Sequence, residues 1–324
     1  AINRAMRDVF FDVDVALSHG SALEFDMALT TDTDWTDVLT PTTSAKATTA
    51  RRTPFGIRSY NLINNVANEG TQSATLDVTM TKRVKGFAIA SCNVGTASFR
   101  LYDVTNSADA DDAAVTHSEE TPQLMIQDWQ DVSATAREFA ARLLGTTATS
   151  DIFWNALWLY KEDELLVPLP AATSEHFMAP YLYQLRPTGN TTATNVWNAR
   201  SLKRQALVEG KDYFLQFHHP GANPYAVLFK DSSYYNYPLM VQARRPYSDL
   251  VTFSAETDTT TCPINLLKPR VKQEIIDTVL IPRGINRSVV TYQRVGAQRE
   301  IERANAGRPV VREGHRRPFQ IPKA

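Results

Sequence analysis

The sequence predicts a mainly β protein: an antiparallel, jelly-roll-like β-sandwich, a second β-rich region with one amphipathic helix, and extended terminal arms. Short segments between Arg52 and Tyr160 alternate apolar and polar residues, as strands with one buried face do. Polar loops separate these segments, and no helical period lies between them, which argues against a parallel α/β sheet. The chain of 324 residues is long enough to bury two cores.

We divide the chain into four predicted parts. Residues 1–51 are an N-terminal β-hairpin arm and linker, residues 52–160 the sandwich, residues 161–281 the second β-rich region ending in a helix, and residues 282–324 a basic extended C-terminal arm. No segment approaches the roughly 18 consecutive apolar residues that cross a bilayer, so we expect no membrane partner. The first residues lack the apolar run of a secretion signal.

The N-terminal part contains two segments with a period of two, residues 11–17 and 23–29. They predict a β-hairpin with one apolar and one acidic face. A helix over Met6–Leu17 is the competing interpretation, because apolar residues there also fit a 3.6-residue period. Thr30–Pro54 is rich in Thr, Ser, Ala and Asp, which indicates a linker or an extended arm.

Strands are predicted along the whole sandwich, with a long acidic loop at Ser107–Glu120. Phe55-Gly56-Ile57-Arg58-Ser59 leads into the strands, which are predicted at Ala74–Thr81, Phe87–Cys92, Ala97–Tyr102, Leu124–Trp129, Arg137–Leu144 and Ile152–Tyr160. In the last strand, alternation predicts two groups of side chains on opposite faces. One face carries Phe153, Asn155, Leu157 and Leu159, and the other carries Trp154, Ala156, Trp158 and Tyr160. Both faces are largely apolar, so we expect this strand to be buried from both sides.

The second region begins after a polar hinge at residues 161–164. Its predicted strands are Leu165–Pro170, Phe177–Leu185, Asp212–His218, Tyr225–Phe229 and Tyr237–Ala243. Pro263–Leu280 changes to a helical period and predicts an amphipathic helix that Pro282 ends. Beyond Gly284 no apolar period is sustained, and Asn305–Pro309 would break a helix, so we expect an extended tail.

The formal net charge of −1 hides an uneven distribution of charge along the chain. From Pro282 onward, ten Lys or Arg residues face three Glu, giving +7, so residues 1–281 carry −8. The arginines of this predicted assembly arm are Arg283, Arg287, Arg294, Arg299, Arg303, Arg308, Arg312, Arg316 and Arg317. We expect the arm to pair with the acidic part of a neighbouring subunit. We do not expect nucleic acid as a partner, because only Tyr292 and Phe319 could stack on bases.

The common catalytic and metal-binding motifs are absent from the sequence. His218-His219 is the nearest approach to a catalytic or metal pair, but adjacent strand residues point to opposite faces. Glu175-His176 is a weaker pair, and Asp109, Asp111 and Asp112 lack the spacing of a calcium loop. Cys92 and Cys262 have no metal-ligand spacing and are expected to be reduced structural thiols. We therefore predict no catalytic residue, no metal and no cofactor, and a protein that is not an enzyme.

Aromatic residues offer one possible ligand site. Trp129, Trp154 and Trp158, with Tyr102 and Tyr160, would form a sugar-stacking platform if their rings were exposed, because a flat ring covers the apolar face of a pyranose. Burial of the last strand from both sides is the alternative use of these rings, and the one we favour.

Three stretches resemble the jelly-roll of carbohydrate-binding modules: Phe55-Gly56-Ile57-Arg58-Ser59, Ser98-Phe99-Arg100-Leu101-Tyr102-Asp103 and Phe153-Trp154-Asn155-Ala156-Leu157-Trp158-Leu159-Tyr160. This resemblance covers about a third of the chain and implies a sandwich that binds carbohydrate. The chain departs from that family because it has no calcium-ligand constellation near the ends of the sandwich.

A second resemblance begins at Tyr237-Pro238-Leu239-Met240-Val241-Gln242-Ala243-Arg244-Arg245-Pro246-Tyr247 and continues through a Thr-rich loop and the predicted helix. This order of strand, loop and helix is similar to structural proteins around the head-to-tail junction and tail of tailed bacteriophages. The resemblance implies a virion protein made in the host cytoplasm, with other virion proteins as partners.

Taken together, these features predict a non-enzymatic structural component of a bacteriophage particle, at the head-to-tail junction or in the tail. It would assemble as a symmetric homo-oligomer through its arms. The alternative is a carbohydrate-binding, receptor-binding module of a tail fibre or similar protein. A hydrolase that uses His218 or His219 is a third hypothesis.

Overall fold

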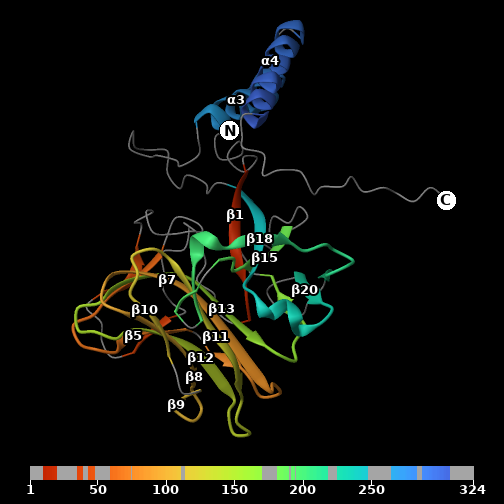
Figure 1. The fold of residues 1–324 in the computed structure, drawn as a ribbon. Helices are drawn as coiled ribbons and strands as arrows, with labels where there is room; N and C mark the ends of the chain where they lie inside the picture. The colour runs from red at the N-terminus through yellow and green to blue at the C-terminus, as the bar shows by residue number, and fades with distance from the viewer. Residues whose placement is uncertain are drawn as a thin grey trace, which may run out of the picture. The chain divides into compact units, whose positions relative to one another are not determined.

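The computed structural model describes residues 10–19, 35–38, 43–47, 59–73, 75–110, 114–169, 181–189, 191–193, 195–217, 225–246, 264–282 and 287–306 (Figure 1). The chain forms two compact units. We call Asp12–Arg244 the β unit, and Ala1–Phe11 together with Arg245–Ala324 the helical unit.

Two antiparallel sheets build a sandwich in the β unit. The first contains β2 (Trp35–Val38), β5 (Glu69–Ser73), β6 (Leu76–Asp77), β8 (Ala97–Asp103), β9 (Ala108–Asp109), β10 (Val115–His117) and β12 (Glu138–Gly145). The second contains β3 (Thr43–Ala47), β4 (Ser59–Ile63), β7 (Arg83–Val94), β11 (Gln123–Asp131), β13 (Asp151–Lys161), β16 (Thr191–Ala193) and β17 (Val196–Asn198). Their orders are β10-β8-β12-β5-β2 and β16-β17-β11-β7-β13-β4-β3. The predicted fold class, a mainly β protein with a jelly-roll-like sandwich, is confirmed.

Alternating side chains of both sheets fill the sandwich core. Phe99 and Leu101 of β8 and Leu143 of β12 point inward from the first sheet. Ala88 and Ala90 of β7 meet them from the second sheet. The inward direction predicted for Ala97, Phe99 and Leu101 is therefore confirmed.

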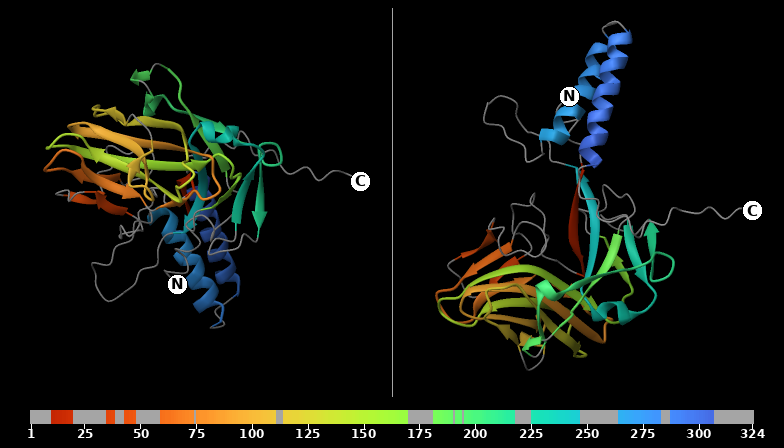
Figure 2. Two further views of the ribbon diagram at one scale, coloured as in Figure 1. Left: turned by 90° about the horizontal axis from the view of Figure 1, so that it is seen from below. Right: turned by 45° about the horizontal axis from the view of Figure 1, so that its top comes forward.

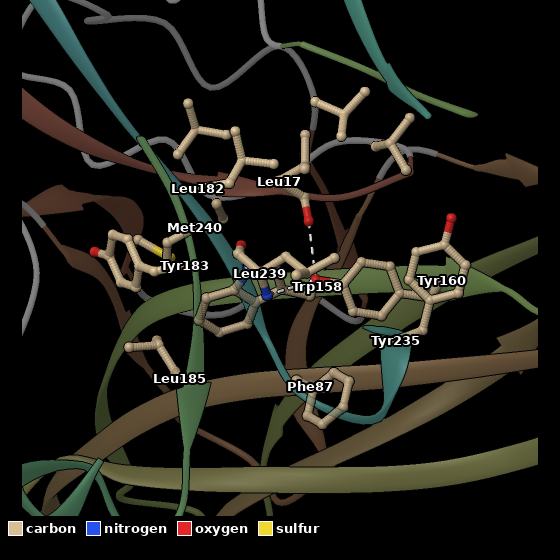
Figure 3. Close-up of a cluster of buried hydrophobic side chains, with 14 of the residues drawn as sticks. Leu17, Phe87, Trp158, Tyr160, Leu182, Tyr183, Leu185, Tyr235, Leu239 and Met240 are labelled. Atoms are coloured by element: carbon tan, nitrogen blue, oxygen red, sulfur yellow. Dashed lines mark hydrogen bonds between the residues drawn. The ribbon is translucent and has the colours of Figure 1, made fainter. Parts of the chain in front are cut away.

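A second core covers the opposite face of the second sandwich sheet. Two smaller sheets close this core. One contains β1 (Phe10–Leu17), β21 (Leu239–Pro246), β15 (Tyr181–Arg186) and β18 (Lys203–Ala206). The other contains β14 (Leu166–Pro168), β20 (Tyr225–Phe229) and β19 (Tyr213–Phe217). Phe87, Trp158 and Tyr160 pack there with side chains such as Leu182 and Met240 (Figure 3). Strand β13 is buried continuously from Ile152 to Tyr160, so its predicted two-sided burial is confirmed.

The strict alternation that we predicted within β13 is wrong at Asn155. The register against β7 shifts between Trp154 and Ala156, because Asn155 is the extra residue of a β-bulge. Trp154 consequently shares the sandwich core with Leu157, whereas Trp158 lies in the second core. A bulge reverses which residues share a face, and the sequence pattern alone carried no sign of it.

Strand β1 belongs to the second core rather than to a free arm. The Tyr160 hydroxyl donates a hydrogen bond to the carbonyl of Leu17 (2.9 Å) and accepts one from the amide of Leu239 (2.9 Å). The Trp158 indole N–H donates to the carbonyl of Leu239 (2.8 Å; Figure 3). The strand predicted at residues 11–17 exists, but β1 neighbours β21; the other half of the predicted hairpin, residues 23–29, lies outside the described residues.

We expect Tyr160→Phe to lower the free energy of unfolding by about 1–3 kcal/mol, because a buried carbonyl and a buried amide both lose their partner. Urea denaturation followed by circular dichroism measures the change. Tyr181→Phe, at a partly exposed tyrosine, is the matched control and should shift stability by only a few tenths of a kcal/mol. Equal stability of the Tyr160→Phe variant and the wild type would contradict this role of the hydroxyl.

Several local predictions for the sandwich need correction. The predicted linker Thr30–Pro54 contributes β2 and β3, one strand to each sandwich sheet. Within Ala74–Thr81 only β6 is a strand, because the Asp77 carboxylate accepts hydrogen bonds from the amide and hydroxyl of Thr79 (2.9 and 2.7 Å) and turns the chain. The predicted loop Ser107–Glu120 contains β9 and β10.

The segment after the sandwich is not a hinge between separate bodies. Glu162 forms an ion pair with Arg83, and Lys161 one with Glu164, within the compact β unit. Four further strands were not predicted: β5 in the first sandwich sheet, and β16, β17 and β18, of which β16 and β17 extend the second sandwich sheet. The second β-rich region and the sandwich therefore share both a sheet and a core.

In its described residues, the helical unit contains the predicted helix and one more. Helix α3 (Ile264–Ile275) continues into a π-helical turn, η4 (Ile276–Leu280), which confirms the helix predicted at Pro263–Leu280. Helix α4 (Arg287–Ala306) follows, so the prediction of an extended arm is wrong for residues 287–306 (Figures 1 and 2). None of the helices in the described part of the chain is long and apolar enough to cross a membrane.

Tertiary packing explains why α4 forms without a strong apolar period. Helix α3 packs against α4, and Ala297 and Ile301 of α4 are buried. Ion pairs join Lys272 to Glu300 and Asp277 to Arg294, each at 3.4 Å. From the first ion pair to the second, the residue number rises from 272 to 277 on one side and falls from 300 to 294 on the other. The two helical segments are therefore antiparallel.

Candidate functional site

The predicted sugar-stacking platform is not assembled on the surface. Trp154 and Trp158 are both 0% exposed, and they lie in different cores on opposite faces of β13. Neither ring presents a face to a ligand, which corrects their role as stacking residues. Tyr160 is buried in the same way. Trp129 and Tyr102 are the members of the set that remain partly exposed.

Trp129 lies beside two cations at the end of β11. The Lys85 ammonium lies 5.7 Å and the Arg83 guanidinium 5.8 Å from the centroid of the Trp129 ring. Lys85 also forms an ion pair with Asp128 (2.9 Å), and this hydrogen bond lowers the pKa of the Asp128 carboxyl. These cation–π contacts help to hold the ring in place.

The outward face of the first sandwich sheet carries a second aromatic group. We call Gln72, Arg100, Tyr102, Asp109 and Arg142 the outer sheet face. The register of β12 places Arg142 between Arg100 of β8 and Gln72 of β5. Arg100 and Tyr102 alternate with residues of the sandwich core, so they point away from it.

The outer sheet face combines flat polar groups with one aromatic ring. The Arg142 guanidinium carbon lies 3.1 Å from the centroid of the Tyr102 ring, and its Nε donates to Gln72 Oε1 at 3.0 Å. Arg100 forms an ion pair with Asp109. An aromatic ring surrounded by guanidinium, amide and carboxylate groups is suited to sugar hydroxyls and a pyranose ring. Arg142 covers one face of the Tyr102 ring.

A cavity of about 330 Å³ lies at one end of the sandwich. It is bounded by the turn at residues 78–82 and the loop at residues 131–137, and Lys82, Asp131 and Arg137 contribute charge to its wall. Its volume is near the lower limit for pockets that bind small ligands.

Most of the candidate catalytic and metal-binding residues named from the sequence lie outside the described part of the chain. His218, His219, Glu175, His176, Asp111 and Asp112 lie outside the described residues. Asp109 belongs to the outer sheet face through its ion pair with Arg100. Among the residues that the structure describes, no group of three or more His, Cys, Asp or Glu side chains is arranged to hold a metal ion.

The arginines of the predicted arm are divided between helix and undescribed chain. Arg287, Arg294, Arg299 and Arg303 belong to α4, and Arg294 forms the ion pair with Asp277. The remaining five, Arg283, Arg308, Arg312, Arg316 and Arg317, lie outside the described residues.

Sequence reasoning missed the contribution of Gln72 and Arg142 to the outer sheet face. Each lies on a strand whose partner is distant in the chain, and only the register brings them together. It also missed the outward side of α4, where Tyr292 is 82% exposed. The spacing of Tyr292, Val295, Arg299 and Glu302 fits a helical stripe, but polar members interrupt its hydrophobic signal.

The chain matches no protein-family model and no curated protein. It is similar to solved structures of carbohydrate-binding modules. The CBM22-1 xylan-binding domain of Paenibacillus barcinonensis Xyn10C has a TM-score of 0.34 and 13% identity over 45% of this chain and 97% of that domain. TmCBM61, solved with β-1,4-galactotriose, has a TM-score of 0.30 and 10% identity over 40% of this chain and 88% of that one.

A bacteriophage protein is also similar in structure. The enzymatically active domain of bacteriophage CBA120 tailspike protein 4 has a TM-score of 0.30 and 15% identity, over 40% of this chain and 20% of the tailspike chain.

Proposed function

We propose that this protein is a non-enzymatic structural component of a bacteriophage particle, at the head-to-tail junction or in the tail, and that it assembles as a symmetric oligomer. The bacteriophage part of the proposal rests on the sequence resemblance described above. The assembly part rests on one observation about charge.

The two compact units carry opposite charge. The β unit has 18 Lys or Arg against 26 Asp or Glu, a net −8, and the helical unit has 16 against 9, a net +7. The positive excess of the helical unit comes mainly from residues 282–324, which alone carry +7. Opposite charge on two separately folded parts favours contact between neighbouring copies and fixes their relative orientation.

The use of the aromatic residues supports the same proposal. Two of the three tryptophans that a sugar platform required fill cores of the β unit. Large aromatic side chains placed this way stabilise a rigid block rather than bind a ligand. A stable β unit is suited to serve as a repeated building block in an oligomer.

The proposal predicts that the full-length protein forms oligomers whose stability depends on salt. We expect the fraction of oligomer, measured by sedimentation velocity, to fall between 0.1 M and 1 M salt, because the Debye length shrinks from about 10 Å to about 3 Å. A chain that stays monomeric at every concentration and salt, and that never enters particles, would contradict the proposal.

A second candidate function is carbohydrate binding, favoured by the outer sheet face with its partly exposed Tyr102 ring. If this face binds sugar, Tyr102→Ala should lose at least about fivefold in affinity on a glycan array, since the loss of a ring on which a base stacks costs about 1–3 kcal/mol and a sugar stacks on a ring in the same way. Trp129→Ala is the control and should keep the affinity. Absence of binding to any glycan would end this candidate.

A further inference from the structure

Two arginines stand directly opposite each other on the outer sheet face. Arg100 of β8 and Arg142 of β12 are register partners. Both side chains point away from the sandwich core, because their sequence neighbours Leu101 and Leu143 point into it. The Cβ atoms of such opposed residues lie about 4.5–5.5 Å apart, and like charges in these positions are destabilising. A pair that breaks this local rule indicates a functional site.

Only one of the two charges has an acidic partner within the described residues. Arg100 forms an ion pair with Asp109. Arg142 stacks on the uncharged ring of Tyr102 instead. The next charged side chain on the outward side of β12 is Glu138, four residues away and therefore about 13 Å along the strand. The outer sheet face thus has an excess of positive charge at Arg142.

The two guanidinium groups also retain unused hydrogen-bond donors. Arg142 donates from Nε to Gln72, and neither of its Nη groups has a hydrogen-bond partner among the described residues. The Nε of Arg100 is buried and has no hydrogen-bond partner. A buried donor without an acceptor costs stability. Because a guanidinium presents its N–H groups in a planar fork that matches a carboxylate, two adjacent forks with unused donors are suited to bind one.

We propose that the outer sheet face binds the carboxylate of a uronic acid unit in a glycan, between Arg100 and Arg142. This inference rests on the carbohydrate-binding candidate described above and names the class of sugar. The Tyr102 ring and the Gln72 amide already hold the Arg142 guanidinium in place. Binding therefore costs less conformational entropy than it would with a free arginine side chain.

Asp109 favours a sugar over other anions. Its side chain is 41% exposed, and its carboxylate accepts hydrogen bonds but donates none. A phosphate group or an acidic side chain of a protein would bring a second negative charge toward Asp109. A uronic acid unit carries hydroxyl groups beside its carboxylate, so it can donate to Asp109 while it accepts from the arginines. The partly exposed Tyr102 ring offers an apolar surface to the C–H groups of the same sugar.

Matched pairs of oligosaccharides test the role of charge in the full-length protein. The probes are trimers of galacturonic, glucuronic and mannuronic acid, each compared with its methyl ester in isothermal titration calorimetry. At least one acid should bind about tenfold or more tightly than its ester, because only the acid forms charge-assisted hydrogen bonds with the arginines.

Variants test the place of the site. Arg100→Gln and Arg142→Gln should each lower the preference for the acid to less than about threefold, with circular dichroism unchanged. Arg200→Gln, at an exposed arginine outside this face, is the matched control and should keep the preference. A preference that survives in both Arg100→Gln and Arg142→Gln would overturn the inference.

The outcomes separate this inference from the functions proposed above. Equal affinity for acids and esters would overturn it and leave the carbohydrate-binding candidate standing. Binding to none of these probes and to no neutral glycan would overturn both, whereas the proposed assembly is tested separately by sedimentation velocity. Binding to a sulfated oligosaccharide but to none of the three acids would overturn the assignment to a carboxylate.

Discussion

Trp158→Ala is expected to lower the free energy of unfolding by about 3–5 kcal/mol. The indole is fully buried in the core that joins the sandwich to the smaller sheets, and truncation leaves a large cavity there. The carbonyl of Leu239 also loses the indole N–H that it accepts at 2.8 Å. Urea denaturation followed by near- and far-ultraviolet circular dichroism measures the loss.

Two variants separate the contributions of this residue. Trp158→Phe keeps much of the apolar volume but removes the N–H, so its expected cost is about 1–3 kcal/mol. Trp129→Ala, at a partly exposed ring, should cost clearly less than Trp158→Ala, although both remove an indole. A cost below about 1 kcal/mol for Trp158→Ala would contradict the packing described for the second core.

The stability of the protein should fall as the pH drops from about 6.5 toward 4, because two buried histidines stay neutral in the folded state. Burial lowers the pKa of His19 to about 4, outweighing the nearby Glu164 carboxylate, which raises it. Burial likewise lowers the pKa of His117 to about 4. The unfolded chain, with an ordinary histidine pKa near 6.5, binds more protons in this range, so acid favours unfolding.

The expected loss is on the order of 2 kcal/mol per histidine between pH 7.5 and pH 4.5. It is read from urea denaturation at a series of pH values. His19→Gln and His117→Gln should each reduce the slope of stability against pH by up to one proton, whatever they do to stability at pH 7.5. Slopes that match the wild type in both variants would show that neither histidine is neutral in the folded protein.

Local alternation predicted the strands where each one has a single buried face. Ala97, Phe99 and Leu101 are inward and Arg100 and Tyr102 are outward, as the period of two requires. The same rule failed in β13, since a single bulge residue, Asn155, shifts Trp154 to the other face. The outer sheet face could not be predicted either, because Gln72, Arg100 and Arg142 are brought together by strand register.

Of the two C-terminal helices, one could be predicted from the sequence and the other could not. Helix α3 follows from its apolar stripe, whereas α4 owes its stability to α3 and to ion pairs such as Arg294–Asp277. Residues 287–306 therefore lacked a signal that could separate them from an extended arm. The net charge of residues 282–324 was visible in the sequence, but their place in a compact unit that begins at Arg245 was not.

By itself, the sequence determined the fold class, the two-sided burial of residues 152–160 and the separation of charge, because each depends on the order of residue types along a short stretch. The tertiary structure alone decided which core receives Trp154 and Trp158, that β1 pairs with β21, and that part of the basic tail is helical. These outcomes depend on contacts between residues far apart in the chain. The free energies of such contacts cannot be read from a local sequence pattern.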